Sequence, residues 1–86
     1  MDTPYYKAQS GLALLKDAVY QLLQNSYPKG LRNVDIGKSL GIYSGHVRHE
    51  GHISRTLLEM MQTDGVIEQR SDKLWYLLIH PLENGD

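Results

Sequence analysis

The stretch from Gly51 to Gly65 constrains the fold of this chain most strongly, because two glycines enclose an amphipathic pattern. In a helix, five apolar residues of the stretch follow the spacing of one face: Ile53, Leu57, Leu58, Met60 and Met61. That phase leaves four polar residues outside: Ser54, Arg55, Glu59 and Gln62. Gly65 supplies the left-handed residue that commonly ends a helix. The pattern therefore predicts a helix that ends at Gly65, with a strand beginning at Val66.

Two short segments follow this helix: residues 66–70, which open with Val66 and Ile67, and the mostly apolar residues 74–78. Ser71-Asp72-Lys73 connects them. Short apolar runs on either side of a polar turn are typical of a β-hairpin. Trp75 and Leu77 share one face of the second strand, because side chains alternate along a strand.

Upstream, a 3–4 spacing of apolar residues predicts a first helix from about residue 10 to 26: Leu12, Leu15, Val19, Leu22 and Leu23. Thr3-Pro4 is an alternative start for this helix, and Gly11 is a possible interruption. The cluster Tyr27-Pro28-Lys29-Gly30 ends it. A second, short helix follows, with Asn33 as its N-cap and Gly41 as its terminator. Residues 43–52 show no sustained period, which favours a loop.

The length of 86 residues predicts one domain over residues 1–86, with a core at about 10–79 and a frayed acidic tail at 81–86. The chain has no cysteine, no apolar run long enough to cross a bilayer, and no signal-peptide layout at its start. We therefore expect a cytoplasmic protein without membrane association. The residues of known catalytic motifs are missing, so we expect neither an enzyme nor a cofactor.

Charge is distributed unevenly along the chain. The formal net charge is −1, yet the segment from Lys29 to Arg55 has five basic residues against two acidic ones, a local charge of +3. Three histidines in the same segment, His46, His49 and His52, add positive charge when protonated. They also raise a metal-site hypothesis, but their spacing matches no established zinc signature, and we expect no metal.

The order of these elements, with an isolated apolar Leu31 before the second helix, resembles the winged helix-turn-helix domain. Residues 31–42 resemble the first helix of the motif, with Ile36 and Leu40 at core positions, and residues 53–69 resemble a recognition helix that runs into a wing. The resemblance covers about residues 10–79 and implies a mainly α fold with a small β-hairpin, a three-helix core plus wing. About ten residues separate Ile42 from Ile53, where the simplest motif has a turn of three or four.

The resemblance implies double-stranded DNA as the partner, bound through a recognition helix at about 52–64 and a wing at about 66–78, in a small transcriptional regulator. Arg55 would contact guanine or phosphate, and Ser54 would donate to phosphate. The candidate DNA contacts are Arg32, Lys38, Arg48, His49, His52, Ser54, Arg55, Arg70 and Lys73.

Several alternatives stay open at this stage. Arg55 would also suit a solvated helix face or an ion pair with Glu59, and charges at a hairpin tip serve solubility. A winged helix can instead act as a protein-interaction module or as an accessory subunit of a larger complex. We also expect a homodimer through the first helix, with Tyr5, Tyr6 and Leu82 outside the motif.

Overall fold

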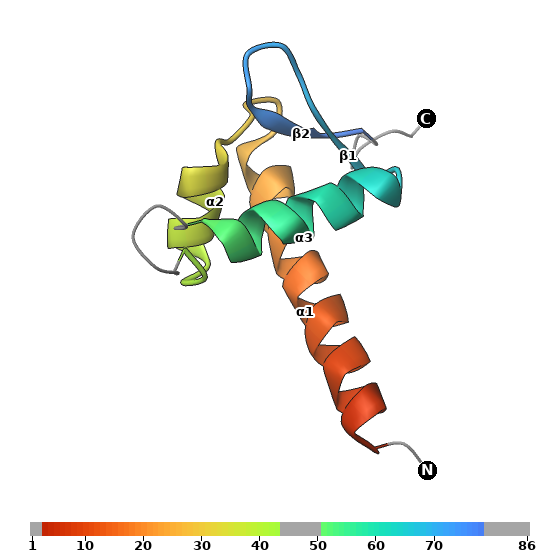
Figure 1. Ribbon diagram of the computed structural model, residues 1–86. Coiled ribbons are helices and arrows are strands. Elements are labelled where there is room, and N and C mark those ends of the chain that lie inside the picture. Colours follow the sequence, from red (N-terminus) through yellow and green to blue (C-terminus); the bar gives the residue numbers. More distant parts are fainter. Residues whose placement is uncertain (1–2, 44–50, 79–86) are drawn as a thin grey trace.

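The computed structural model of the chain describes residues 3–43 and 51–78, which form a mainly helical structure with a small antiparallel hairpin (Figure 1). The elements in chain order are α1 (Thr3–Ser26), α2 (Asn33–Ser39), α3 (His52–Thr63), β1 (Ile67–Gln69) and β2 (Trp75–Leu77). This element order confirms the expectation of a mainly α chain with a hairpin, and it is compatible with a helix-and-wing layout.

Helix α1 is longer than its apolar pattern predicts. It begins at Thr3 rather than near residue 10 and continues through Gly11 without a break. Its C-terminal half packs into the core through the buried Val19 and Leu23. Its N-terminal half extends away from the rest of the molecule (Figure 1).

Helix α3 buries one face, but the predicted phase is wrong at two positions. Leu57, Leu58 and Met61 are buried as expected, whereas Ile53 is 50% exposed and Ser54 is 0% exposed. The buried positions follow the spacing i, i+3, i+4 and i+7 counted from Ser54, so a polar residue occupies the first core position of the helix. The apolar pattern placed Ile53 there because hydrophobicity was its only criterion.

Glycines bound α3 at both ends, as the sequence predicts. Gly51 occupies the N-cap position with a φ of 83°, and Gly65 follows the helix with a φ of 84°. Both values lie in the left-handed region that side chains other than glycine rarely adopt.

The hairpin pairs β1 with β2 in an antiparallel register, Ile67 with Leu77 and Gln69 with Trp75. Trp75 and Leu77 are both buried, which confirms that they share the inner face. A third segment joins this small sheet, because Leu31 exchanges two backbone hydrogen bonds with Trp75, of 3.1 and 2.8 Å. Leu31, the isolated apolar residue of the sequence, therefore pairs with the edge of β2 that does not face β1.

Helix α2 begins at Asn33 and ends before Gly41, whose φ is 73°. The prediction that Asn33 is the N-cap is wrong, because Arg32 occupies that position and makes no side-chain capping bond. Asn33 instead makes hydrogen bonds to residues at the start of α3, which are described below.

The core lies where the three helices and the hairpin meet. Its buried hydrophobic members are Val19, Leu23, Ile36, Leu57, Leu58, Met61, Ile67, Trp75 and Leu77. Across residues 3–43 and 51–78, none of the helices has the length and hydrophobicity needed to cross a lipid bilayer.

The burial of α3 generates a stability prediction. Leu57 is 3% exposed, so Leu57→Ala should lower the free energy of unfolding by about 2 to 5 kcal/mol through lost burial and a residual cavity. Ile53→Ala, on the exposed side of the same helix, should change it by less than about 1 kcal/mol. Chemical denaturation of the two variants at low protein concentration measures both values, and a larger loss for Ile53→Ala would contradict the observed helix phase.

Candidate nucleic-acid interface

The start of α3 is fastened to α2 by a buried polar contact. The Ser54 hydroxyl donates to Asn33 Oδ1 at 2.7 Å, and the Gly51 carbonyl oxygen lies 3.1 Å from the same hydroxyl. The Asn33 side-chain amide also donates to the Gly51 carbonyl, at 3.2 Å. These bonds join residues that are far apart in sequence, so they fix the position of α3 relative to α2.

Gly51 is needed at this junction for space as well as for its backbone angle. A Cβ atom on Gly51 would lie 2.5 Å from the Tyr43 ring and 2.8 Å from the Asn33 amide nitrogen. Contacts that short do not occur between real side chains, so a larger residue would displace the Tyr43 and Asn33 side chains.

The role predicted for Ser54 is therefore wrong. Its side chain is fully buried and hydrogen-bonded within the protein, so it cannot donate to a phosphate at the surface. Its function in this structure is to orient the helix that presents Arg55.

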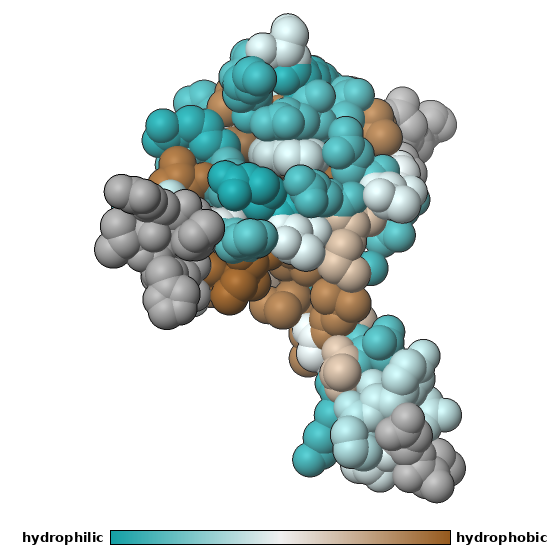
Figure 2. All heavy atoms as spheres, in the orientation of Figure 1, coloured by the Kyte–Doolittle hydropathy of each residue, from teal (hydrophilic) through white to brown (hydrophobic). Residues whose placement is uncertain are grey.

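A polar cleft of about 210 Å³ lies between α3 and the hairpin, and we call it the α3–hairpin cleft. The residues that line it are Asn33, Arg55, Glu59, Gln62, Gln69, Lys73 and Trp75. Two of the predicted DNA contacts, Arg55 and Lys73, thus come together from elements that are separate in sequence. Figure 2 shows mostly hydrophilic residues over the hairpin and the front of α3.

Arg55 is the cation that α3 contributes to this cleft. The alternative ion pair with Glu59 does not form, and within the described parts of the chain Arg55 has no carboxylate partner. Its guanidinium is therefore available for an external anion or hydrogen-bond acceptor. Glu59 lines the same cleft and supplies its one carboxylate among the described lining residues.

The hairpin tip is held by a network of side chains. The Tyr76 hydroxyl donates to Asp72 Oδ2 at 2.5 Å, and Asp72 Oδ1 accepts from the Leu74 backbone N–H at 2.9 Å. Arg70 lies 3.9 Å from the Tyr76 ring centre and pairs with Glu68 at 2.8 Å. This network leaves Lys73, at a φ of 71° on the turn, facing the cleft.

The same hydrogen bond shifts two pKa values in opposite directions. Donation from the Tyr76 hydroxyl, with help from the Leu74 N–H, lowers the pKa of Asp72. The Asp72 carboxylate raises the pKa of Tyr76. Both shifts favour the state in which the carboxylate is ionised and the phenol is protonated.

Three other predicted contacts have partners inside the protein. Arg32 forms two hydrogen bonds to the Asp35 carboxylate, at 3.0 and 3.1 Å, and this pairing lowers the pKa of Asp35. Lys38 lies 5.5 Å from the Tyr43 ring centre, and Arg70 is paired as described above. None of the three lines the α3–hairpin cleft.

The remaining predicted residues lie partly outside the described chain. His52 is the first residue of α3 and is exposed, whereas Arg48, His49 and His46 fall in residues 44–50, outside the described ranges. Leu82 of the predicted dimer surface also lies outside them. In residues 3–43 and 51–78, no three His, Cys, Asp or Glu side chains gather into a possible metal site.

Five residues that line the cleft are absent from the candidate DNA contacts: Asn33, Glu59, Gln62, Gln69 and Trp75. Gln69 could have been found from strand alternation, because it lies opposite Trp75 in the predicted hairpin. Asn33 could not, because its contact with the start of α3 crosses the long connection after Tyr43.

Comparisons of the chain with models of known protein families, with curated proteins and with solved structures give no match. The function must therefore be argued from the arrangement of the residues themselves.

The buried junction predicts an effect of Ser54 on stability. Ser54→Ala leaves the partly buried Asn33 carbonyl oxygen without its donor, so the free energy of unfolding should fall by about 1 to 3 kcal/mol despite alanine's higher helix propensity. Because both residues share one bond, Asn33→Ala combined with Ser54→Ala should cost less than the two single changes together. An unchanged unfolding midpoint for Ser54→Ala would argue against the junction.

The Asp72–Tyr76 bond predicts a pH dependence of stability. Since the folded-state pKa of Asp72 is lowered, its contribution should be lost as pH falls below about 4. Since the folded-state pKa of Tyr76 is raised, the contribution should also be lost as pH rises above about 10. The difference in melting temperature between the unmodified chain and Tyr76→Phe should therefore be largest between these limits. Tyr6→Phe is the control, and a Tyr76→Phe difference independent of pH would contradict the bond.

Proposed function

We propose that this chain is a winged helix-turn-helix domain that binds double-stranded DNA, with α3 in the major groove and the hairpin against neighbouring phosphates. The observation that carries the proposal is the convergence of Arg55 and Lys73 on one open, polar cleft from two different elements. Among residues 3–43 and 51–78 the Arg55 guanidinium has no carboxylate partner, and such a group is suited to guanine or phosphate.

The dimensions of α3 fit this role. Its 12 residues make a rod about 18 Å long, and a single helix fits the major groove, which is about 12 Å wide. The exposed side of its N-terminal half presents Arg55 to the α3–hairpin cleft, near the end from which recognition helices commonly contact bases. His52 instead lines the groove between α1 and α3.

The hairpin supplies the second contact. Lys73 lies on its turn, and the Asp72–Tyr76 bond and the stacked Arg70 hold that turn in place. A positioned lysine contributes a phosphate contact that fixes register without selecting sequence. We therefore assign specificity to Arg55 and orientation to Lys73, in a small transcriptional regulator or a DNA-binding subunit of a larger complex.

Protein association is a second candidate function, and a separate observation favours it. Large apolar side chains are exposed on α1 and on the side of α3 that faces it, among them Leu14 at 71% and Ile53 at 50%. Neither residue lines the α3–hairpin cleft, so both activities are compatible with one chain.

The DNA proposal predicts different losses for two cations. On a duplex selected from a random pool, Arg55→Ala should cost about 1 to 3 kcal/mol, with a smaller loss on unrelated duplexes. Lys73→Ala should weaken binding to the selected duplex and to unrelated duplexes equally. It should also flatten the dependence of log affinity on log salt concentration. Fluorescence anisotropy measures both effects.

Lys7→Ala is the matched control, since it removes one positive charge from the far end of α1 and should leave affinity nearly unchanged. The measurements belong at about 50 mM salt, because the net negative charge opposes the approach of DNA and phosphate contacts weaken as salt rises. A folded chain that binds no duplex at this salt concentration would overturn the proposal.

A further inference from the structure

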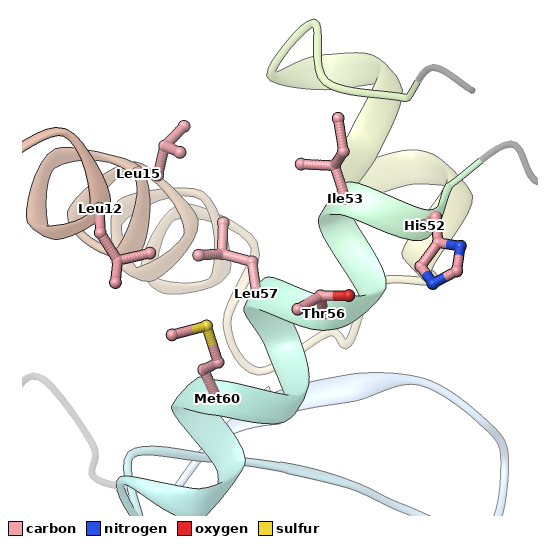
Figure 3. A pocket seen from close by; sticks show the side chains of 7 residues that line it. All are labelled: Leu12, Leu15, His52, Ile53, Thr56, Leu57 and Met60. Carbon is pink, nitrogen blue, oxygen red and sulfur yellow. The ribbon is translucent and has the colours of Figure 1, made fainter. Parts of the chain in front are cut away.

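An apolar groove separates α1 from α3 on the side away from the α3–hairpin cleft, and we call it the α1/α3 groove. Its volume is about 300 Å³, and its walls are formed by Leu12 and Leu15 of α1 with five residues of α3: His52, Ile53, Thr56, Leu57 and Met60. Figure 3 shows Leu12, Leu57 and Met60 pointing toward one another across it. Figure 2 shows hydrophobic residues gathered below α3, where α1 leaves the packed part of the molecule.

The half of α1 that extends beyond this groove is exposed along its whole length. Every residue from Thr3 to Gly11 is exposed, including Tyr5 at 54% and Tyr6 at 56%. Between Thr3 and Leu15 the only charged side chain is Lys7. An exposed helix is normally rich in charge, and depletion of charge marks the centre of protein interfaces.

The apolar stripe of α1 continues unbroken from the core into this exposed half. Alternating steps of three and four residues connect Tyr5, Ala8, Leu12, Leu15, Val19 and Leu22, which is the spacing by which one helix packs along another. In the packed half, Val19 is buried and Leu12, Leu15 and Leu22 contact the core. Tyr5 and Ala8 therefore extend an interface that the chain itself covers only in part.

We propose that a second copy of this chain covers the surface, with the two α1 helices packed antiparallel and the exposed half of each lying along the α1/α3 groove of the other. In this arrangement Tyr5 of one copy faces the Leu15 level of its partner, and Ala8 faces the Leu12 level. The helix and the groove belong to the same chain, so one two-fold axis satisfies both at once. A parallel pair would leave both grooves uncovered.

Physical considerations favour this occupant. A half-helix of about ten residues is marginal in water without packing, and the second copy supplies that packing. Covering one helix side and one groove on each copy makes a small interface, at the lower end of the range for specific association. We therefore expect a reversible dimer with a micromolar dissociation constant. This association does not depend on the proposed binding of DNA.

Sedimentation equilibrium of the full chain, without DNA, tests the proposal. The mass should rise from 9.8 kDa toward twice that value as the concentration increases from about 1 to about 300 μM. Ile53→Glu places a charge in the groove and should raise the dissociation constant at least about tenfold. Leu78→Glu is the matched control, because Leu78 is 46% exposed on the hairpin, and it should leave association unchanged.

A variant that should strengthen the dimer provides a test that misfolding cannot mimic, because misfolding would only weaken association. Ala8→Leu adds apolar area on the stripe and should tighten the dimer at least about threefold. Ala13→Leu makes the same change on the same helix, off the stripe, and should not. A single 9.8 kDa species throughout the range, with helicity confirmed by circular dichroism, would overturn the proposal. So would a dimer indifferent to both Ile53→Glu and Ala8→Leu.

The direction of the helices can be tested by cross-linking, because the chain has no cysteine of its own. An equimolar mixture of Tyr5→Cys and Leu15→Cys chains should form a mixed disulfide dimer under oxidation. Tyr5→Cys alone should not form one, since two Tyr5 positions lie at opposite ends of an antiparallel pair. Efficient cross-linking of Tyr5→Cys with itself would show a parallel pair and overturn the arrangement.

Discussion

The position of α3 depends on one buried hydroxyl. Ser54 stands at the first core position of the helix, and its bond to Asn33 joins α2 to α3 where the chain between them is long. A short turn would hold two such helices by its length alone, whereas here a polar contact must do so. This contact fixes the rotation of α3 about its axis, and that rotation determines where the exposed side chains next to Ser54 point. Arg55 faces the cleft because Ser54 faces Asn33.

Most of the fold was predictable because its boundaries are marked by residues with strong backbone preferences. Gly41 and Gly65 end helices at left-handed angles, and alternation placed Trp75 and Leu77 on the inner face of the hairpin. The phase of α3 was less predictable, since a buried serine and an exposed isoleucine invert the usual relation between hydrophobicity and burial. Ser54 can be buried because its hydroxyl is hydrogen-bonded to Asn33. No local sequence pattern indicates this contact, because the two residues are far apart in the sequence.

The candidate site was predictable only in part for a related reason. The role expected for Arg55 follows from the resemblance to the winged helix-turn-helix domain, but whether a cation is available depends on its neighbours in space. Arg32 is held by Asp35, Arg70 by Glu68 and Tyr76, and both arrangements depend on side-chain geometry. The exposed residues of α3 separate into a polar side toward the hairpin and an apolar side toward α1. Two different kinds of surface thus share one helix of 12 residues.

The short segment from Leu31 to Asn33 connects both walls of the cleft. Leu31 is hydrogen-bonded to Trp75 in the hairpin, and Asn33, two residues later, is bonded to the start of α3. The two walls therefore cannot move apart without breaking one of these contacts. A molecule that enters the cleft would meet a backbone already in its final arrangement. Binding there would then lose little backbone conformational entropy, and the ordering cost would fall mainly on the long side chains of Arg55 and Lys73.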